Sequence, residues 1–453
     1  MIIESRNPAT DEVLETFESS SDADVDRTVE RAHEAFRAWR RRPVAERAAP
    51  LRAAAELLRK GALSFARTMA LEMGKPLAEG KAEAEKCAMT CDWYADNAER
   101  LLAPEPHPTD AHESFVRFDP LGVVFAVMPW NYPFWQVLRF AAPALVAGNG
   151  GVLKHAPNVT RCALHIEQIF RDAGLPGGLF GVVHGGPEVA SRAIAHPHVV
   201  AVTLTGSERA GASVAEQAGR ALKKSVLELG GSDPFVVLAD ADLAKAAEVA
   251  ATARLLNSGQ SCIAAKRFIV VEPVAERFLE LFVSAMKRRK VGDALEEGTQ
   301  IGPQARLDLR DNLHRQVAET VARGGKLLCG GQVPGGKGAF YPPTVLEAGK
   351  GTPALDEETF GPVAAVARVK DEAAAIELAN DTPYGLGASI WTADRARGAR
   401  LAAEIEAGAV FVNGMVKSDP RVPFGGIKRS GYGRELSEYG LREFTNIKTV
   451  WIG

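Results

Sequence analysis

The chain lacks the features of metal-binding, disulfide-rich and membrane proteins. Its five cysteines and nine histidines show no metal-ligand spacing, and the odd number of cysteines argues against a disulfide framework. The start of the chain has no basic region followed by an apolar core, and the most apolar window, around residues 134–147, contains Arg139. We therefore expect reduced thiols, no metal, no membrane partner and a cytoplasmic location.

The chain also lacks a strong imbalance of charge. It holds 54 lysines and arginines against 57 aspartates and glutamates, and the net charge of −3 is spread along the sequence. This pattern gives no support to nucleic acid as a partner and leaves small metabolites as the expected ligands. The 453 residues, 46% hydrophobic and 25% charged, are typical of an enzyme with two or three domains.

Hydrophobic periodicity predicts an α/β fold. Two long helices are expected near the start, the first capped by Ser21 or Asp22. From residue 123 onward, short β-branched runs alternate with helical stretches, which predicts a parallel sheet wrapped by helices, and a second α/β set follows Cys262. The expected helices include 24–39, 45–73, 274–289 and 307–323, and the expected strands are 123–128, 151–154, 199–204, 235–238, 268–271, 364–369 and 410–412.

Glycine-rich turns offer only weak evidence for phosphate binding. Gly206 and Ser207 follow the strand at 199–204 and begin a helix, where free N–H groups suit a phosphate. However, this turn lacks the G-x-G-x-x-G fingerprint, and similar turns occur without a ligand. Residues 331–337 approach a P-loop, but Gly338 replaces the Ser or Thr that binds magnesium, so a surface loop is expected.

Three polar residues are candidates for catalysis. Cys262 ends a small polar stretch and Glu228 precedes Leu-Gly-Gly, a pair that permits covalent catalysis followed by hydrolysis. A free cysteine is also commonly a small buried hydrophobe. Asn131 follows the strand at 123–128, so it can donate to an oxyanion or merely cap a proline-rich turn. The residue patterns leave these alternatives open. They also leave open whether Glu358 is a loop residue or a carboxylate that binds a ribose.

Five motifs together resemble those of the aldehyde dehydrogenase superfamily. They occur in the family's order and approximate spacing, and the resemblance runs from residues 7–10 to residues 423–431. Chance would scarcely produce this combination. The motifs are residues 129–133, 153–154, 228–231, 259–262 and 358–362.

The resemblance implies an aldehyde dehydrogenase-like fold with three parts. A doubly wound cofactor domain is expected at 1–102 and 121–230, and an α/β catalytic domain at 231–425. A small β extension for oligomerisation is expected at 103–120 and 434–453. The exposed edge of its last strand would be a liability unless another chain covers it, so we expect a homodimer or a homotetramer.

The resemblance also implies the reaction. Cys262 would attack an aldehyde to give a hemithioacetal, whose oxyanion Asn131 and the Cys262 N–H would hold. After loss of a hydride to the nicotinamide, Glu228 would activate the water that cleaves the thioester. Serine hydrolase chemistry is not expected, because the G-x-S-x-G elbow is missing.

The cofactor expected from the resemblance is NAD or NADP. Strongly NAD-selective members carry a glutamate three residues beyond the motif lysine, where this chain has Pro157, so a 2′-phosphate meets no local repulsion. The adenosine ribose would lie near Lys154, and the pyrophosphate near Gly206 and Ser207. The remaining contacts implied are Glu358 at the nicotinamide ribose, Phe360 beside it, and Trp130 and Leu229 along the cleft.

The substrate is expected to carry a carboxylate. Trp135, Gln136 and Arg139 share one face of a helix that should border the aldehyde tunnel. A cation there suits a substrate with a distal carboxylate, although Arg139 can instead pair with a protein carboxylate. Residues 153–158, 228–235 and 418–421 resemble the short bacterial succinate-semialdehyde dehydrogenases, and this resemblance makes Ser418, with Arg421 as a helper, a second candidate ligand.

Other functions stay open at this point. The aldehyde can be glutarate semialdehyde, another ω-carboxy aldehyde, or one of a broad aliphatic range. A cofactor-binding protein with only a structural role is a further alternative, which the presence of Cys262, Glu228 and Asn131 disfavours.

Overall fold

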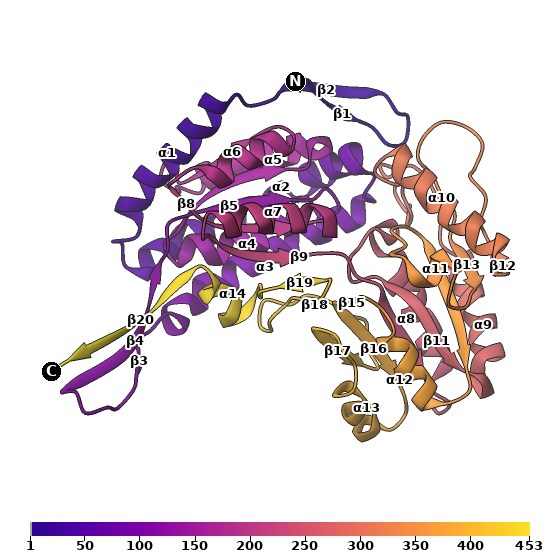
Figure 1. Ribbon diagram of the computed structural model, residues 1–453. Coiled ribbons are helices and arrows are strands. Elements are labelled where there is room, and N and C mark those ends of the chain that lie inside the picture. Colours follow the sequence, from indigo (N-terminus) through magenta and orange to yellow (C-terminus); the bar gives the residue numbers. More distant parts are fainter. Residues whose placement is uncertain (1) are drawn as a thin grey trace.

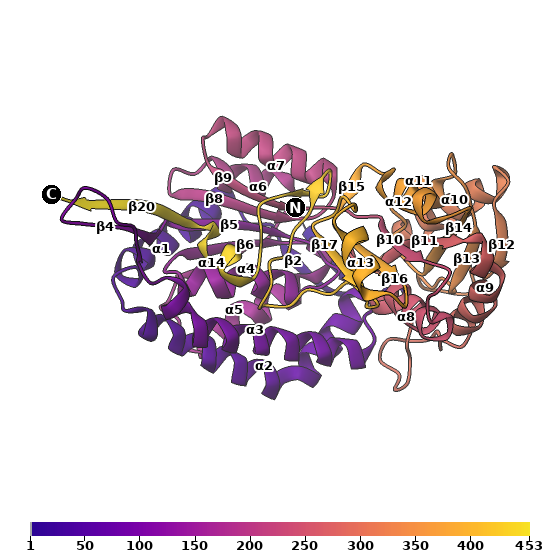
Figure 2. The ribbon, with the colours of Figure 1, turned by 90° about the horizontal axis from the view of Figure 1, so that it is seen from below.

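The computed structural model describes residues 2–453, which form two α/β bodies and a projecting arm (Figure 1). Seen from below, the two bodies lie side by side and the arm extends away from the first body (Figure 2). The expectation of an α/β fold with parallel sheets is confirmed. None of the helices in residues 2–453 combines the length and apolarity that a membrane crossing requires.

The first body contains a six-stranded sheet in the order β19-β9-β8-β5-β6-β7, parallel apart from β19. Helices cover both of its faces, with α1, α6 and α7 on one side and α4 and α5, backed by α2 and α3, on the other. The strands are β5 (Val123–Met128), β6 (Gly150–His155), β7 (Phe180–Val183), β8 (Val199–Thr205), β9 (Lys224–Glu228) and β19 (Gly431–Tyr432). The helices are α1 (Asp22–Trp39), α2 (Val44–Met73), α3 (Leu77–Leu101), α4 (Trp135–Val146), α5 (Thr160–Asp172), α6 (Pro187–Ala195) and α7 (Glu208–Arg220).

The two predicted N-terminal helices are present. Helix α1 begins at Ser21, whose side chain accepts from the Asp24 N–H while the Asp24 carboxylate accepts from the Ser21 N–H. This reciprocal pair satisfies two donors that a helix start leaves free. Helix α2 ends at Gly74, whose φ of 76° is the left-handed conformation that glycine adopts without strain.

The second body contains a seven-stranded sheet in the order β12-β13-β14-β11-β10-β16-β17, in which only β12 is antiparallel. Its strands are β10 (Asp233–Val237), β11 (Ala265–Val271), β12 (Lys326–Cys329), β13 (Thr344–Glu347), β14 (Val363–Val369), β16 (Gly387–Trp391) and β17 (Ala409–Val412). Its helices are α8 (Leu243–Leu255), α9 (Glu272–Lys287), α10 (Leu307–Ala322), α11 (Pro353–Asp356), α12 (Glu372–Asn380) and α13 (Arg395–Ala402).

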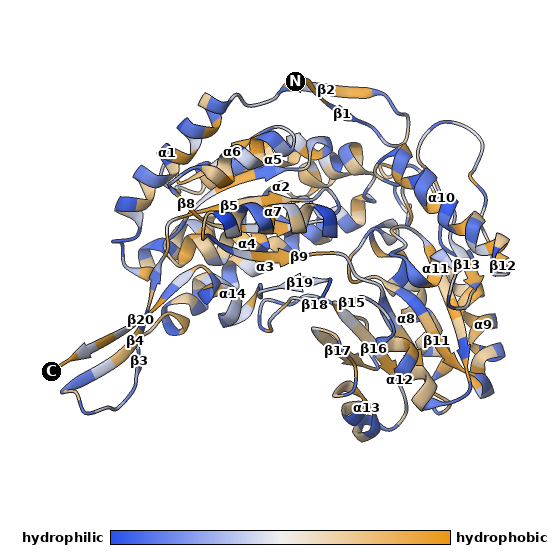
Figure 3. Ribbon diagram, in the orientation of Figure 1, coloured by the Kyte–Doolittle hydropathy of each residue, from blue (hydrophilic) through white to orange (hydrophobic). Residues whose placement is uncertain are grey.

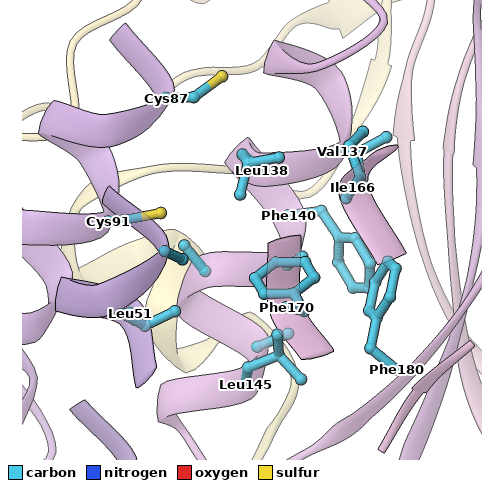
Figure 4. Packing of buried hydrophobic residues seen from close by; sticks show 14 of the residues in the cluster. Leu51, Cys87, Cys91, Val137, Leu138, Phe140, Leu145, Ile166, Phe170 and Phe180 are labelled. Atoms are coloured by element: carbon cyan, nitrogen blue, oxygen red, sulfur yellow. The ribbon is translucent and has the colours of Figure 1, made fainter. Parts of the chain in front are cut away.

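Buried strands supply the core of both bodies, and most of the strand residues are hydrophobic (Figure 3). In β10, Phe235 and Val237 pack toward α8 and α9, whereas Val236 packs toward α12 and α13. Burial of both faces explains why these strands are continuous apolar runs. In the first body, the rings of Phe140, Phe170 and Phe180 lie close together where α4, α5 and β7 meet (Figure 4). The ring centroids of Phe170 and Phe180 are 4.9 Å apart.

The arm is a three-stranded antiparallel sheet in the order β20-β4-β3. Ile447, Trp451 and Ile452 of β20 are 65%, 56% and 42% exposed, which is unusual for large apolar side chains so close together. The strands of the arm are β3 (Glu105–Pro106), β4 (Glu113–Pro120) and β20 (Thr445–Ile452). The short elements outside the arm are β1 (Ile2–Arg6), β2 (Val13–Glu18), β15 (Tyr384–Gly385), β18 (Ile427–Lys428) and α14 (Ser437–Glu443). The arm falls within the predicted oligomerisation extension, while the predicted domain boundaries stay a prediction.

Candidate active site

Four predicted site residues lie where neighbouring parallel strands end. Lys154 is the second-last residue of β6, and Glu228 is the last residue of β9. Asn131 follows β5, and Gly206 follows β8. These four strands are adjacent in the sheet, and Thr205 pairs directly with Glu228. The carboxyl edge of an open parallel sheet is where such folds hold ligands.

The loop that carries Cys262 has a strained backbone. Asn257, Ser258 and Gly259 have φ values of 57°, 55° and 76° in succession. Left-handed conformations cost about 1–3 kcal/mol at residues other than glycine, so the surrounding structure must stabilise this loop. At Gly259 a side chain is excluded, because a Cβ atom would lie 2.3 Å from the backbone of Gly361.

Hydrogen bonds from Asn131 hold this loop against the first sheet. The Asn131 Nδ2 donates to the Gln260 carbonyl at 3.1 Å, and the Asn131 carbonyl accepts from Asn257 Nδ2 at 2.7 Å. Asn131 is buried, and its second amide hydrogen is left for another acceptor near Cys262. The loop is also held at Asn257, whose N–H donates to the Glu79 carboxylate at 2.7 Å.

Lys266 fixes the other side of the Cys262 loop. Its buried ammonium donates to the carbonyls of Ser261 at 3.0 Å and Cys262 at 2.7 Å, and lies 3.5 Å from the Glu358 carboxylate. Gly231 makes room for the same carbonyl, because a Cβ there would lie 2.8 Å from the Cys262 oxygen. The backbone of Cys262 is thus positioned by both the second sheet and the Glu-Leu-Gly-Gly motif.

The thiol of Cys262 is neutral in this environment. Burial raises its pKa to about 11, more than the nearby positive charges of Arg139 and Lys266 lower it. Because the thiolate is the nucleophile, attack on a carbonyl requires a base or added positive charge in the site.

Glu228 is a buried carboxyl group without a hydrogen-bond partner for either oxygen. Burial, followed by the negative charge of Glu435, raises its pKa well above the ordinary value, so the neutral acid is favoured. Its side chain faces Gly425, where a Cβ would lie 2.8 Å from Oε1. Glu228 is not among the residues that line the cavity beside Cys262.

The predicted nicotinamide-side residues cluster beside this loop. Glu358 accepts a hydrogen bond from the Gly231 N–H at 3.0 Å and faces Lys266. The ring of Phe360 meets the ring of Trp130 edge to face, with 5.7 Å between their centroids. A carboxylate and two aromatic rings therefore converge on the polar loop, although their role toward a cofactor stays a prediction.

The predicted adenosine and phosphate residues lie along the same sheet edge. Lys154 is buried, has no carboxylate within 4.0 Å among residues 2–453, and has a pKa lowered chiefly by burial. Exposed Pro157 contributes no charge beside it. Ser207 caps α7 by accepting from the Ala210 N–H, and Leu229 packs against Gly211 of that helix. These positions place a cation without a carboxylate partner and the start of a helix along one edge of the sheet, where an anion can bind.

His155 is structural, as expected for a buried histidine in this strand. Its Nε2 donates to the Pro133 carbonyl at 2.9 Å while Nδ1 accepts from the Ala156 N–H. Burial lowers its pKa to about 4, so it is neutral and supports the loop that carries Asn131. Residues 2–453 hold no group of three or more His, Cys, Asp or Glu side chains that could hold a metal ion.

A cavity of about 180 Å³ opens beside Cys262. Its walls are largely apolar, and they include all three residues predicted to contact the substrate, namely Trp135, Arg139 and Ser418. Arg421 lies outside this lining and pairs with Asp419 instead.

Arg139 fits both interpretations that the sequence left open. It lines the cavity, yet it is buried and forms an ion pair with buried Glu435. Its guanidinium carbon also lies 4.6 Å from the centre of the Phe424 ring. The positive charge facing the cavity is therefore largely compensated by a protein carboxylate.

Sequence reasoning missed five charged residues of this site: Glu79, Glu83, Lys86, Lys266 and Glu435. Three of the residues, Glu79, Glu83 and Lys86, recur at helical spacing on α3 and line the cavity together. That spacing was available in the sequence, but nothing in it indicated that this helix face meets α4.

Comparisons with known proteins identify the relatives of this chain. Residues 1–450 match the model of the "Aldehyde dehydrogenase family". The chain is 52% identical to the probable succinate-semialdehyde dehydrogenase [NADP(+)] of Synechocystis over the full length of both. It is 48% identical to the succinate semialdehyde dehydrogenase [NAD(P)+] Sad of Escherichia coli, over 98% of this chain and 96% of that one. Among solved structures, the succinic semialdehyde dehydrogenase of Streptococcus pyogenes with NADP+ matches at a TM-score of 0.97 and 39% identity, over 99% of both chains.

Proposed function

This chain belongs to the aldehyde dehydrogenase family, and from that premise we propose that it oxidises succinate semialdehyde to succinate with NADP or NAD. The observation that carries the choice of substrate is the cavity that joins Cys262 to cationic side chains within apolar walls. A neutral aldehyde gains nothing from those charges, whereas a substrate with a distal carboxylate does.

The first chemical step takes place on Cys262. Cys262 first loses its thiol proton to water; the thiolate sulfur then forms a bond to the aldehyde carbon as the C=O π bond breaks, which leaves an oxyanion that the Asn131 amide and the Cys262 N–H stabilise. The proximity of Asn131 to the Cys262 loop supports this role. When bound, the nicotinamide supplies the acceptor for the hydride that leaves the carbon, so the carbon becomes a thioester of Cys262.

The second step releases the acid. Glu228 removes a proton from a water molecule, the resulting hydroxide adds to the thioester, and the C–S bond breaks to give succinate and the thiolate. A change of rotamer at Glu228 would break no hydrogen bond, and its raised pKa makes it a strong base once it is ionised. Water that enters the cavity thus completes the reaction without another protein nucleophile.

The residues along the sheet edge fit a dinucleotide. Lys154 is a buried cation without a carboxylate partner among residues 2–453, and Gly206 precedes α7 with only the Leu204 side chain within 4 Å of where a Cβ would lie. Lys154 would hold the adenosine ribose or its 2′-phosphate, Gly206 and Ser207 the pyrophosphate, and Glu358 the nicotinamide ribose. Leu229, Trp130 and Phe360 would form the apolar sides of the cleft, and uncharged Pro157 accommodates either cofactor.

A steady-state panel tests the proposed function. Succinate semialdehyde, glutarate semialdehyde and butanal are each compared with NAD and with NADP. We expect kcat/KM to be highest for succinate semialdehyde, with measurable rates for both cofactors. A higher kcat/KM for glutarate semialdehyde would transfer the proposal to a longer ω-carboxy aldehyde, and a preference for butanal would reject a carboxylated substrate.

The arm supports a homodimer or a homotetramer. Strand β20 exposes Ile447, Trp451 and Ile452 together on the arm, a surface that a second copy of the chain would bury. Sedimentation equilibrium distinguishes a monomer, a dimer and a tetramer. The cytoplasmic location expected from the sequence is testable by cell fractionation.

A further inference from the structure

One face of α3 carries a series of charged side chains into the cavity. Glu79, Ala82, Glu83 and Lys86 line it at spacings of three and four residues. Glu79 lies at the Cys262 loop, where it accepts from the Asn257 N–H. Lys86 lies two helical turns farther along, about 10 Å from Glu79 along the helix axis at 1.5 Å per residue. This helix face thus runs from the nucleophile toward the far end of the cavity.

Both acidic residues of this face have partners of their own, whereas Lys86 has no carboxylate partner. The Glu83 carboxylate forms a buried ion pair with Lys75 and accepts from the N–H groups of Phe134 and Trp135, each at 2.9 Å. For Lys86, no carboxylate among residues 2–453 lies within the 4.0 Å of an ion pair. Its Nζ donates to Ser418 Oγ at 2.7 Å and lies 4.1 Å from the centre of the Trp135 ring.

Arg139 presents the opposite arrangement in the same cavity. Its guanidinium is already paired with Glu435, so a substrate carboxylate that approached it would compete with a buried protein carboxylate. The ammonium of Lys86 has three donors, of which Ser418 uses one, and the Ser418 hydroxyl keeps its own hydrogen to donate. Two adjacent donors with one uncompensated positive charge suit one carboxylate.

We infer that Lys86 is the specificity-determining cation of this enzyme, and that it binds the terminal carboxylate of an ω-carboxy aldehyde together with Ser418. This inference rests on the proposed function, because it presumes a substrate with a carboxylate. Trp135 forms the adjoining wall, and its ring face restrains the ammonium by a cation–π contact. Arg139 lines the same cavity and pairs with Glu435 through its Nε.

The electrostatic surroundings of Lys86 agree with this role. Burial and, after it, the positive charge of Arg139 lower its pKa to about 8, against the opposing effects of Cys87, Glu83 and Asp419. The ammonium is thus poorly solvated without a counter-ion. A bound carboxylate would favour the charged form of Lys86.

Substitution of Lys86 with matched controls tests the inference. Lys86→Met removes the charge and keeps an unbranched side chain against Trp135, Lys86→Arg keeps the charge, and Lys81→Met removes a charge from the exposed face of the same helix. For Lys86→Met we expect kcat/KM for succinate semialdehyde to fall about 10- to 100-fold, the range for one charge-assisted bond. The value for butanal should stay within about twofold, Lys86→Arg should retain most of the activity, and Lys81→Met should match the wild type.

Binding of succinate provides a readout that does not depend on turnover. Calorimetry should show its Kd raised about tenfold or more in Lys86→Met and unchanged in Lys81→Met. Equal losses on both aldehydes, or no loss with succinate semialdehyde, would overturn the inference. If Lys86→Met does not fold, Lys86→Gln serves as the second neutral variant with the same expected outcomes. A wild-type enzyme that does not prefer succinate semialdehyde to butanal would instead contradict the proposed function.

Discussion

The two ends of the substrate cavity are built by different means. At the nucleophile end, constraints on the backbone dominate. Residues 257–259 are left-handed, Gly259 lies close to Gly361, and Lys266 binds the carbonyls of Ser261 and Cys262. At the other end, which we call the anchor end, the side chains of Lys86, Trp135, Arg139 and Ser418 meet from three separate segments. Changes at the nucleophile end should therefore affect every aldehyde, whereas changes at the anchor end should discriminate between aldehydes.

The difference also concerns charge. At the nucleophile end the two reactive groups are neutral, since burial raises the pKa of both Cys262 and Glu228. The anchor end holds one cation, Lys86, that no protein carboxylate compensates among residues 2–453. A site with a neutral reactive end and a charged distal end orients a substrate that bears an aldehyde at one end and a carboxylate at the other.

The largest effect is expected at the nucleophile. Cys262→Ser should lower kcat/KM by at least about 10⁴-fold with charged and neutral aldehydes alike, because a buried hydroxyl is far harder to ionise than a thiol. Rapid-quench measurements should detect no covalent acyl enzyme, whereas mass spectrometry of the wild type should show one on the peptide with Cys262. Turnover by Cys262→Ser at the wild-type rate would remove the covalent mechanism altogether.

The oxyanion donor should have the next largest effect. Asn131→Ala removes the amide that faces the Cys262 loop, and loss of one such donor generally costs about 10²- to 10³-fold in kcat. Because Asn131 also contacts Gln260, Asn131→Asp is a useful second variant that keeps the size of the side chain and removes the donor. Both should slow succinate semialdehyde and butanal equally, and a selective loss with one aldehyde would place Asn131 in substrate recognition instead.

Sequence and structure agree best where the information is local in the chain. Cys262, Glu228 and Asn131 each lie within a short motif, and alternating strands and helices are sufficient to predict the sheet whose edge carries two of them. The anchor end is different, because Lys86 belongs to a helix whose periodicity shows that it is amphipathic and not what it packs against. Its packing against Trp135 and its bond to Ser418 arise only from tertiary structure.

Partners of buried charges are also difficult to predict. The sequence allowed Arg139 to bind either a substrate or a protein carboxylate, but it could not identify Glu435, which is distant in the chain. Likewise, Glu228 could be predicted as a carboxylate near Cys262, but not as one without hydrogen bonds and with a raised pKa. The burial of Glu228 and Arg139 depends on residues 424–435. This segment follows the last strand of the second sheet in the chain and pairs with β9 of the first sheet.

Variants of the buried pair of Arg139 and Glu435 distinguish a contribution to stability from a contribution to substrate recognition. Arg139→Met should destabilise the protein by about 3–5 kcal/mol, because it leaves the Glu435 carboxylate buried and unpaired. The double variant Arg139→Met/Glu435→Gln should recover most of this loss, as measured by urea denaturation. In the double variant we expect kcat/KM for succinate semialdehyde to fall relative to butanal by about tenfold or less, a smaller change than for Lys86→Met.

A larger selective loss in the double variant than in Lys86→Met would reverse the roles of the two cations. Arg139 would then be the principal ligand of the carboxylate, and Glu435 would be displaced when the substrate binds. No selective loss would confine Arg139 to a structural role, in agreement with its compensated charge.

The pH dependence should show the smallest effect and should have opposite signs at the two ends. With butanal, kcat/KM should rise from pH 7 to pH 9, because Cys262 and Glu228, whose pKa values are raised, react in their deprotonated forms. Lys86 acts in its protonated form, and with a pKa of about 8 its ammonium fraction falls about tenfold over the same interval. The ratio of kcat/KM for succinate semialdehyde to that for butanal should therefore fall by up to about tenfold. In Lys86→Arg the guanidinium stays charged, so the ratio should be flat; a parallel fall in that variant would assign the titration to another group of the anchor end.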